Sequence, residues 1–369
     1  MKSREVIVVG AGPAGLVAAI AARQRGFDVT VLDARTPPID KPCGEGILPR
    51  GVAALKSLGV SLPDEDVLPF QGIRFVDGDV SARADFANEA GFSMRRVKLH
   101  RFLIDRATEA GAELLWGARV VRMDAGLITT TSKSYAYRWL IGADGHSSQV
   151  RTWARLERPR WQSRRRFGFC SHFGVRPWSD VTEVHWANGC QIFVTPMKDA
   201  EVGVAVLSRD PARRLERAIE DFPELADKLR GSARITKEAG DITSLTVLPA
   251  VARDRVALVG DASGTVDALT GHGLSLSFQQ ALPLAEAMSR GDLASYQAAH
   301  QKISAVPVLM TRLMLLMTAS DWIRRRTIRL FQNSPTAFSK MLEIHTEAAP
   351  LSSVGFGDLA NFGWEFLKA

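Results

Sequence analysis

The sequence contains few cysteines and no long apolar run, internal repeat or low-complexity segment. Its three cysteines, Cys43, Cys170 and Cys190, lie far apart and form no Cys-x-x-Cys pair. This disfavours a disulfide framework and a zinc site, so no metal site is expected. The longest apolar stretch, residues 306–319, is too short to span a bilayer and contains Arg312, and glycines break the first apolar run at once. We therefore expect a cytoplasmic protein without a signal peptide or a transmembrane segment.

The composition is that of a globular protein. Of the 369 residues, 46% are hydrophobic and 24% are charged, which excludes intrinsic disorder and a collagen-like chain. The length suits two packed domains, or one domain with a second inserted into it. The net charge of +7 includes arginine clusters at 164–166 and 324–326, but neither aromatic-basic interleaving nor a helix-turn-helix pattern accompanies them. The charge is therefore assigned to a solvated face or to the counter-charge of an anionic cofactor, not to nucleic acid.

A nucleotide-binding pattern occupies the first part of the chain. Residues 5–9 predict a buried strand, the Gly-x-Gly-x-x-Gly turn of residues 10–15 follows, and an alanine-rich helix continues to about Arg25. A second apolar strand, residues 28–32, ends at Asp33. This order of strand, glycine-rich turn, helix, strand and acidic residue predicts an adenine dinucleotide site.

Each residue of this pattern has a mechanical reason. Gly10 permits the tight turn, Gly12 lets the backbone approach a pyrophosphate, and Gly15 allows the helix to pack closely on the strand. The helix N-terminus then presents free N–H groups to the phosphates. Asp33 accepts hydrogen bonds from ribose hydroxyls and repels a 2′-phosphate, so this pattern predicts FAD or NAD and does not distinguish them.

Two later glycine-rich segments follow predicted strands. The strand of residues 138–141 leads into Gly-Ala-Asp-Gly at 142–145, and the strand of residues 256–259 leads into Gly-Asp at 260–261. Gly-His-Gly at 271–273 then opens a long helix. An acidic residue at the carboxyl end of a parallel strand faces the ligand crevice, so Asp261 is placed to bind sugar or polyol hydroxyls. The second helix start offers another nest of backbone N–H groups.

These three motifs, in this order and spacing, resemble the class A flavoprotein monooxygenases of the p-hydroxybenzoate hydroxylase fold, over most of the chain to about residue 300. The resemblance implies an α/β protein with a Rossmann-type FAD-binding domain, an inserted antiparallel-sheet substrate domain and a helical C-terminal region. It also implies that the cofactor is FAD and that Arg101 contacts the flavin. The expected FAD-binding domain comprises residues 1–70, 96–160 and 251–290, the substrate domain comprises residues 71–95 and 161–250, and the helical region comprises residues 291–369. The candidate cofactor-binding residues are Gly10, Gly12, Pro13, Ala14, Gly15, Asp33, Ala34, Arg35, Cys43, Gly44, Arg101, Val120, Asp144, Gly145, Gly260, Asp261, Gly271 and Gly273.

Two segments resemble one branch of this family. Lys-Pro-Cys-Gly-Glu-Gly at 41–46 and the segment 260–273 are similar to the geranylgeranyl reductase-like members and their relatives in natural-product biosynthesis. Hydroxylases of the family usually carry proline where Ala268 stands. This departure favours the reductase branch.

Four residues are candidates for catalysis. His172 lies in a predicted strand with small and apolar neighbours and is a candidate for proton transfer. Cys43 is either a catalytic thiol or a small residue that allows close approach to the flavin, and Glu45 is an equal candidate for that face. His272 either approaches the pyrimidine edge of the flavin or is merely tolerated between two glycines. The predicted strands of the substrate sheet are residues 167–176, 182–186, 191–195 and 201–207.

The last third of the chain has helical periodicity at 274–288, 295–319, 322–331 and 336–345. Met310, Met314 and Met317 form a stripe at helical spacing. Core packing is the first interpretation, a methionine-lined tunnel for a lipophilic substrate is the second, and peripheral contact with an anionic membrane is the third.

We predict an FAD-dependent oxidoreductase that acts on a small molecule, with NAD(P)H as transient reductant. The first hypothesis is a monooxygenase that uses O₂ to hydroxylate or epoxidise an aromatic, polyketide-like or lipophilic substrate. The alternative is a geranylgeranyl reductase-like enzyme that reduces a double bond. A third hypothesis, of another class, is a non-enzymatic flavin-binding regulator. The sequence predicts no oligomeric state.

Overall fold

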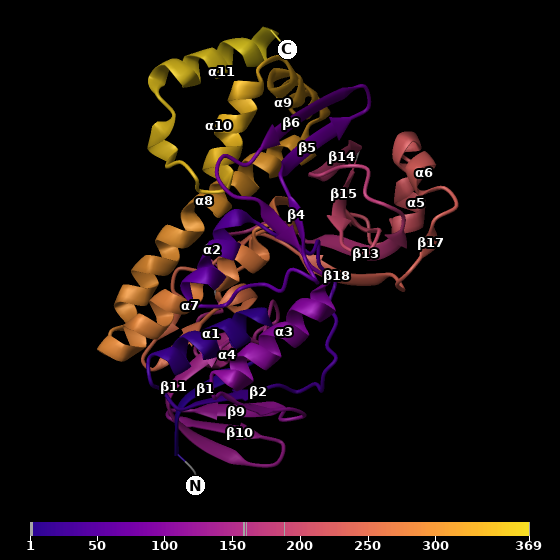
Figure 1. Cartoon of the computed structure of the whole chain (residues 1–369). Coiled ribbons are helices and arrows are strands. Elements are labelled where there is room, and N and C mark those ends of the chain that lie inside the picture. Colours follow the sequence, from indigo (N-terminus) through magenta and orange to yellow (C-terminus); the bar gives the residue numbers. More distant parts are fainter. Residues whose placement is uncertain (1–2, 158, 160, 188, 369) are drawn as a thin grey trace.

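A mostly parallel sheet lies near the N-terminal end of the molecule (Figure 1). The computed structural model describes residues 3–157, 159, 161–187 and 189–368. The strands run in the order β20-β21-β11-β1-β2-β8, and only β20 and β21 pair antiparallel along this path. The antiparallel strands β10 and β9 extend the sheet from β11. The bounds are β1 Ser3–Val9, β2 Val29–Leu32, β8 Glu113–Leu115, β9 Val120–Asp124, β10 Leu127–Thr130, β11 Ser134–Gly142, β20 Ala252–Arg253 and β21 Val256–Leu258.

Burial explains why β1 is a central strand. Val6, Ile7 and Val8 have no exposed surface, as expected for a strand covered on both faces. Helix α1 (Pro13–Gln24) packs against α3 (Arg96–Glu109) and α7 (Gly273–Arg290). Because β1, β2, β11 and β21 are parallel, their carboxyl ends meet at one edge of the sheet, where ligands bind in such folds.

A second, largely antiparallel sheet lies beyond this edge. Its order is β17-β13-β16-β15-β14-β5-β6, with β18 paired to β13, and only β14 and β5 run parallel. The bounds are β5 Gly72–Asp77, β6 Val80–Asp85, β13 Arg166–Gly174, β14 Thr182–Ala187, β15 Cys190–Met197, β16 Glu201–Ser208, β17 Ala233–Arg234 and β18 Ala239–Thr243. The four strands predicted between residues 167 and 207 are confirmed within a few residues. Cys170 and Cys190 lie in β13 and β15.

Short elements connect the two sheets. Strands β3, β7 and β4 form a small sheet, and β12 pairs with β19. These strands are β3 Gly46–Ile47, β4 Leu68–Phe70, β7 Gly91–Ser93, β12 Trp161–Gln162 and β19 Thr246–Val247. The connecting helices are α2 Pro49–Ser57, α4 Gln149–Trp153, α5 Leu215–Ile219, α6 Pro223–Leu229, and the 3-10 turns η1 Gly260–Ser263 and η2 Ala268–Thr270.

The C-terminal helices pack against the outer end of the second sheet, and α9 and α10 lie on β6 (Figure 1). They are α8 Leu293–Ala319, α9 Asp321–Asn333, α10 Pro335–His345, the turn η3 Leu351–Ser353 and α11 Phe356–Lys368. Within the described residues, α8 alone is long and apolar enough to cross a membrane, a criterion that the core helix of a soluble protein also meets. The apolar helix is thus longer than the stretch of residues 306–319 considered above.

Candidate active site

A cavity of about 890 Å³ lies where the two sheets and the C-terminal helices meet. Its lining has two chemically different parts. The polar lining comes mainly from the strand ends of the parallel sheet and includes Asp33, Arg35, Lys41, Arg96, Asp144 and Asp261. The apolar lining comes from β5, β14, β15 and α8 to α10 and includes Phe75, Val184, Phe193, Met314, Phe338 and Met341. A site of this composition suits a ligand with one polar and one apolar portion.

In the first glycine-rich turn, two glycines are packed against the protein and one faces open space. Gly10 has a φ of +105°, and a Cβ there would collide with the Ala143 carbonyl. A Cβ on Gly15 would collide with the Gly10 carbonyl. Gly12 lines the cavity, and a Cβ on it would meet nothing within 4 Å. Gly10 and Gly15 are therefore required by the protein's own packing, whereas Gly12 leaves room on the cavity side.

The carboxylate of Asp33 organises the same turn. Its Oδ2 accepts a hydrogen bond from the backbone N–H of Ala11 at 2.8 Å, and its Oδ1 accepts one from the N–H of Arg35 at 2.8 Å. The cavity lining includes the predicted cofactor-binding residues Pro13, Ala14, Asp33, Ala34, Arg35, Gly44, Val120 and Gly145. These predicted cofactor-binding residues are thus brought together.

The aspartates of the two later motifs, Asp144 and Asp261, both line the cavity. Asp144 lines the cavity, but its carboxylate accepts hydrogen bonds from Ser148 Oγ and from the first N–H groups of α4. Gly260 lies outside the lining, with a φ of +58° and a Cβ position that would press on Ala14. Asp261 lines the cavity, and so do Gly271 and Gly273, where a Cβ would meet nothing within 4 Å.

The structure does not bring Arg101 to the cavity, because it lies exposed on the outer side of α3. Arg96, the first residue of that helix, lines the cavity instead and is only 6% exposed. Its Nη1 is buried and has no hydrogen-bond partner among the described residues. Burial lowers the pKa of the Arg96 guanidinium, and the charges of nearby carboxylates such as Glu45 oppose this shift. An anionic ligand would supply the partner that this buried cation lacks.

Glu45 and His172, far apart in sequence, form a buried pair at the cavity wall. Glu45 Oε2 and His172 Nε2 are 2.5 Å apart, and the side chains are 5% and 8% exposed. The other carboxylate oxygen, Oε1, accepts a hydrogen bond from the backbone N–H of Arg96 at 2.7 Å. On the far side, His172 Nδ1 is 2.9 Å from the hydroxyl of Thr236, which is half-buried. A chain of hydrogen bonds therefore leads from Glu45, which lines the cavity, towards the surface.

Glu45 has a left-handed backbone conformation, with a φ of +59°. A non-glycine residue in this region stores strain and persists only where the surroundings hold it. Here the His172 contact is joined by a hydrogen bond from Thr195 Oγ1 to the Gly44 carbonyl at 3.0 Å. The second sheet thus holds the loop of residues 43–45 in place against the cavity.

Cys43 lines the cavity in this loop, and Cys170 lines it from β13. Cys170 and His172 are two residues apart and so share one face of the strand, with Glu45 opposite His172. Burial raises the pKa of Cys43 to about 11, partly offset by the charge of Arg96, and burial raises the pKa of Cys170 to about 12. Both thiols are therefore protonated at neutral pH, which disfavours the nucleophilic-thiol hypothesis for Cys43.

We expect Cys43 to react slowly with iodoacetamide at pH 7.5 and progressively faster up to pH 11. With a pKa of about 11, the thiolate fraction at neutral pH is on the order of a thousandth or less. Peptide mass spectrometry after timed labelling of the FAD-loaded protein measures this rate, with a free cysteine peptide as control. Labelling at neutral pH as fast as the free peptide would restore the catalytic-thiol hypothesis.

The structure also does not bring the side chain of His272 to the cavity. The ring is 2% exposed, and its Nε2 lies 2.9 Å from the backbone carbonyl of His345, whose ring packs against it. Burial lowers the pKa of His272 to about 4, so the ring is neutral at pH 7. His272 stands at the N-cap of α7 and connects that helix to the end of α10.

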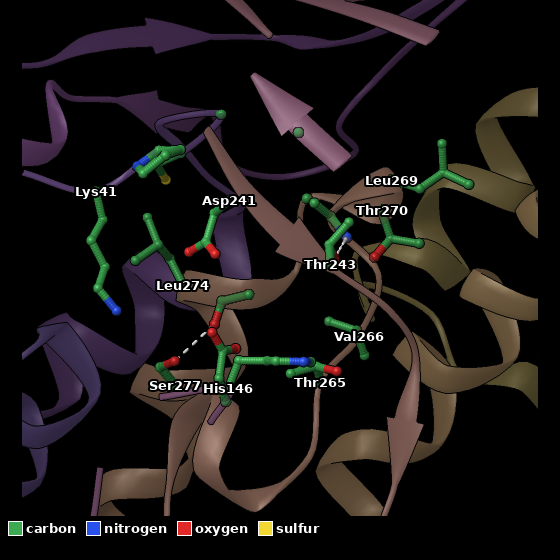
Figure 2. Close-up of a pocket in the computed structure, with 18 of the residues that line it drawn as sticks. Lys41, His146, Asp241, Thr243, Thr265, Val266, Leu269, Thr270, Leu274 and Ser277 are labelled. Atoms are coloured by element: carbon green, nitrogen blue, oxygen red, sulfur yellow. Dashed lines mark hydrogen bonds between the residues drawn. The ribbon is translucent and has the colours of Figure 1, made fainter. Parts of the chain in front are cut away.

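Residues of η2 and of α7 line opposite sides of the cavity (Figure 2). Figure 2 shows Lys41 and Leu274 on one side of the pocket and Leu269 and Thr270 on the other, with Asp241 between them. The methionine stripe also reaches this cavity: Met310, Met314 and Met317 all line it. Met317 also belongs to a buried apolar cluster against which Met314 packs, so the stripe contributes both to the core and to the cavity wall.

Comparison with known proteins gives a family and a set of relatives. The profile of the family described as "FAD binding domain" matches residues 3–291. The chain is 29% identical over 324 residues to menaquinone reductase of Mycobacterium tuberculosis H37Rv, covering 79% of this chain and 78% of that protein. It is 28% identical over 299 residues to digeranylgeranylglycerophospholipid reductase 2 of Methanopyrus kandleri, covering 74% of each.

Two solved structures share the arrangement of sheets and helices. p-Nitrophenol 4-monooxygenase of Pseudomonas putida superposes with a TM-score of 0.78 at 19% identity, covering 94% of this chain and 97% of that one. A geranylgeranyl bacteriochlorophyll reductase-like protein of Thermoplasma acidophilum superposes with a TM-score of 0.75 at 21% identity, covering 98% and 96%. At these identities the likeness concerns the fold.

Proposed function

The chain belongs to the FAD-binding domain family and has the p-hydroxybenzoate hydroxylase fold expected from its sequence, and from this premise we propose that it reduces carbon–carbon double bonds in a lipophilic, isoprenoid-type chain. That it is an FAD-dependent oxidoreductase follows from the family and its relatives. What we propose is the type of reaction, which is reduction of a double bond, and the class of substrate, which is a lipophilic chain.

The polar lining fits FAD. Gly12 leaves room beside the N-terminus of α1, where backbone N–H groups suit a pyrophosphate. Arg96 Nη1, which has no hydrogen-bond partner in the part of the chain that the structure describes, suits a group with negative charge or acceptor oxygens. Asp33 and Asp261 are the candidates for ribose and ribityl hydroxyls, and the open Gly271–Gly273 segment is the candidate for the polar edge of the ring system. When bound, FAD supplies the hydride chemistry, and NAD(P)H is the proposed transient reductant.

The protein's own groups position the substrate and supply the proton. Saturation of a double bond requires one proton in addition to one hydride. Glu45 lines the cavity and is hydrogen-bonded to His172, which reaches Thr236. We assign to these three residues the transfer of that proton from the surface to the cavity. The aromatic and methionine side chains of the apolar lining exclude water around the reacting bond.

The apolar lining is the observation that carries this proposal. Phenylalanines of β5, β15, α9 and α10 face the cavity together with methionines of α8 and α10. Flexible thioethers and aromatic faces suit a long hydrocarbon better than a small polar ring. Two of the relatives described above are named as reductases of menaquinone and of a digeranylgeranylglycerophospholipid, which supports the same substrate class. We further propose a cytoplasmic location.

Anaerobic turnover tests this function. Protein reconstituted with FAD is incubated without oxygen with NADPH or NADH and either geranylgeraniol or a menaquinone that carries an unsaturated side chain. Mass spectrometry is expected to show a product with one double bond saturated. Because the fold also occurs in p-nitrophenol 4-monooxygenase, the same mixtures are repeated in air. A product that contains an added oxygen atom, formed only in air and without saturation, would overturn the proposal in favour of monooxygenation.

A further inference from the structure

Three exposed tryptophans each lie beneath a cation. Trp322 is 57% exposed and lies 4.7 Å from the guanidinium carbon of Arg326, as measured to the ring centroid. Trp364 is 58% exposed and lies under the ammonium group of Lys368 at 4.8 Å. Trp161 is 39% exposed and pairs with Arg312 of α8 at 5.3 Å. Amphipathic rings beside basic side chains are typical of protein surfaces at the headgroup level of a bilayer.

The outer face of α8 continues this surface. Leu313 and Leu316 are 40% and 53% exposed, although both are large apolar residues. Only Ser320 separates the end of α8 from α9, which begins with Asp321 and Trp322. Helix α11 lies against α9, because Arg326 donates hydrogen bonds to the carbonyls of Phe366 and Leu367. We call the exposed residues of these three helices, with Trp161, the docking surface; its apolar members are Trp161, Leu313, Leu316, Trp322, Trp364 and Leu367.

The charge of the docking surface is positive. On α8, Lys302 and Arg312 are exposed and no residue is acidic; on α9, Arg325 and Arg329 are exposed and Arg326 is half-buried, against one exposed aspartate, Asp321. The fourth arginine of α9, Arg324, is buried against Asp77 and does not contribute, and the acidic residues in the sequence of α11, Asp358 and Glu365, offset only part of this positive charge. Surfaces of this sign attract anionic lipid headgroups, and each basic residue near the bilayer contributes to binding. An anionic bilayer therefore matches the docking surface in both charge and apolar character.

The cavity opens within the docking surface. Leu313 and Leu316 line the cavity and are exposed at the same time, and Ile323 and Thr327 of α9 line it from the next helix. The other side of α8 is fixed to the protein: Tyr296 donates a hydrogen bond to the Leu258 carbonyl at 2.7 Å. The helix is therefore held to the parallel sheet and suits contact with a bilayer surface rather than passage through it.

We infer that the docking surface binds the face of an anionic phospholipid bilayer, and that the lipophilic chain enters the cavity from that bilayer between α8 and α9. Binding to the bilayer follows from the surface alone. The entry route rests on the proposed function. Tryptophan rings and leucines enter the headgroup boundary, while arginines and lysine contact the phosphates. A substrate delivered this way moves from hydrocarbon to apolar lining without crossing water.

Vesicle flotation tests the inference with the FAD-loaded protein. Phosphatidylcholine vesicles with and without phosphatidylglycerol are compared at low and high salt. We expect binding to the anionic vesicles, and weaker binding without phosphatidylglycerol or at high salt. The variant Trp322→Ser/Trp364→Ser is expected to lower the partition coefficient about tenfold or more. The matched control is Val121→Ser, since Val121 is 49% exposed on β9, at the opposite end of the molecule (Figure 1).

The outcomes separate this inference from the proposed function. Flavin content and circular dichroism confirm that each variant is folded, and turnover of a detergent-solubilised chain is measured separately. Loss of vesicle binding in the tryptophan variant alone, with detergent-based turnover retained, supports the inference. Absence of binding to anionic vesicles, or an equal loss in Val121→Ser, overturns it. A dimer that the tryptophan substitutions dissociate would also overturn it, because the surface would then serve a second copy of the chain.

Discussion

Gly12→Val is expected to yield a folded protein that does not retain FAD. The backbone at Gly12 is extended, with φ −72° and ψ 176°, a conformation open to any residue. Among the described residues, no atom outside Gly12 and its two chain neighbours lies within 4 Å of the position of a Cβ, so the fold tolerates the side chain. On the cavity side, an isopropyl group separates the N–H groups of α1 from the pyrophosphate. Loss of two charge-assisted hydrogen bonds corresponds to about 3–6 kcal/mol, or at least a hundredfold in FAD affinity.

Flavin absorbance after purification, FAD titration and the thermal midpoint measure this result together. Gly363→Val is the matched control, because a Cβ at Gly363 also meets nothing within 4 Å and this residue of α11 does not line the cavity. Gly15→Val provides the contrast: its side chain would collide with the Gly10 carbonyl, so this variant is expected to misfold. FAD affinity in Gly12→Val equal to that of the unaltered protein would show that the cofactor does not approach this turn.

Many strands and helices of the fold were predictable from local sequence patterns. Continuous apolar runs marked β1, β2 and β21, and helical periodicity marked α7 to α10. These signals are local because burial on both faces, or along one stripe, constrains consecutive residues. The short strands β17 and β18 and the helix α11 were not predicted. Residues 239–243 of β18 are largely exposed and pair only with β13, so the sequence carries no apolar pattern for them.

The cofactor turn was predictable, whereas individual side-chain directions were not. Arg96 and Arg101 lie on the same helix, and only the phase of α3 decides which one faces the cavity. The sequence shows Asp144 as an acidic residue after a strand, but not that its carboxylate caps α4. Likewise, the pairing of Glu45 with His172 joins a loop to a strand 127 residues away. Such contacts depend on the assembled fold and leave no local signal.

Glu45→Gln is expected to retain FAD and to lower the rate of double-bond reduction by about 10²–10³. Glutamine preserves the oxygen that accepts the hydrogen bond from the Arg96 N–H, but it cannot carry a proton to or from His172. His172→Asn interrupts the same chain on the side of Thr236. If the residues act as one relay, the double variant is no slower than the slower single variant, since effects within one unit are not additive.

The second buried Glu–His pair of the same sheet supplies a control for structural effects. Glu183 Oε2 lies 3.0 Å from His185 Nε2, both side chains are buried, and neither residue lines the cavity. Glu183→Gln should therefore lower stability in urea unfolding without lowering turnover. Loss of turnover in Glu45→Gln should also change the solvent isotope effect, because transfer of the proton becomes slower. Glu45→Gln could instead reduce FAD affinity and stability while the turnover per bound flavin and the isotope effect stay unchanged. That result would show that Glu45 only holds the loop against β13 and that the proton reaches the double bond by another route.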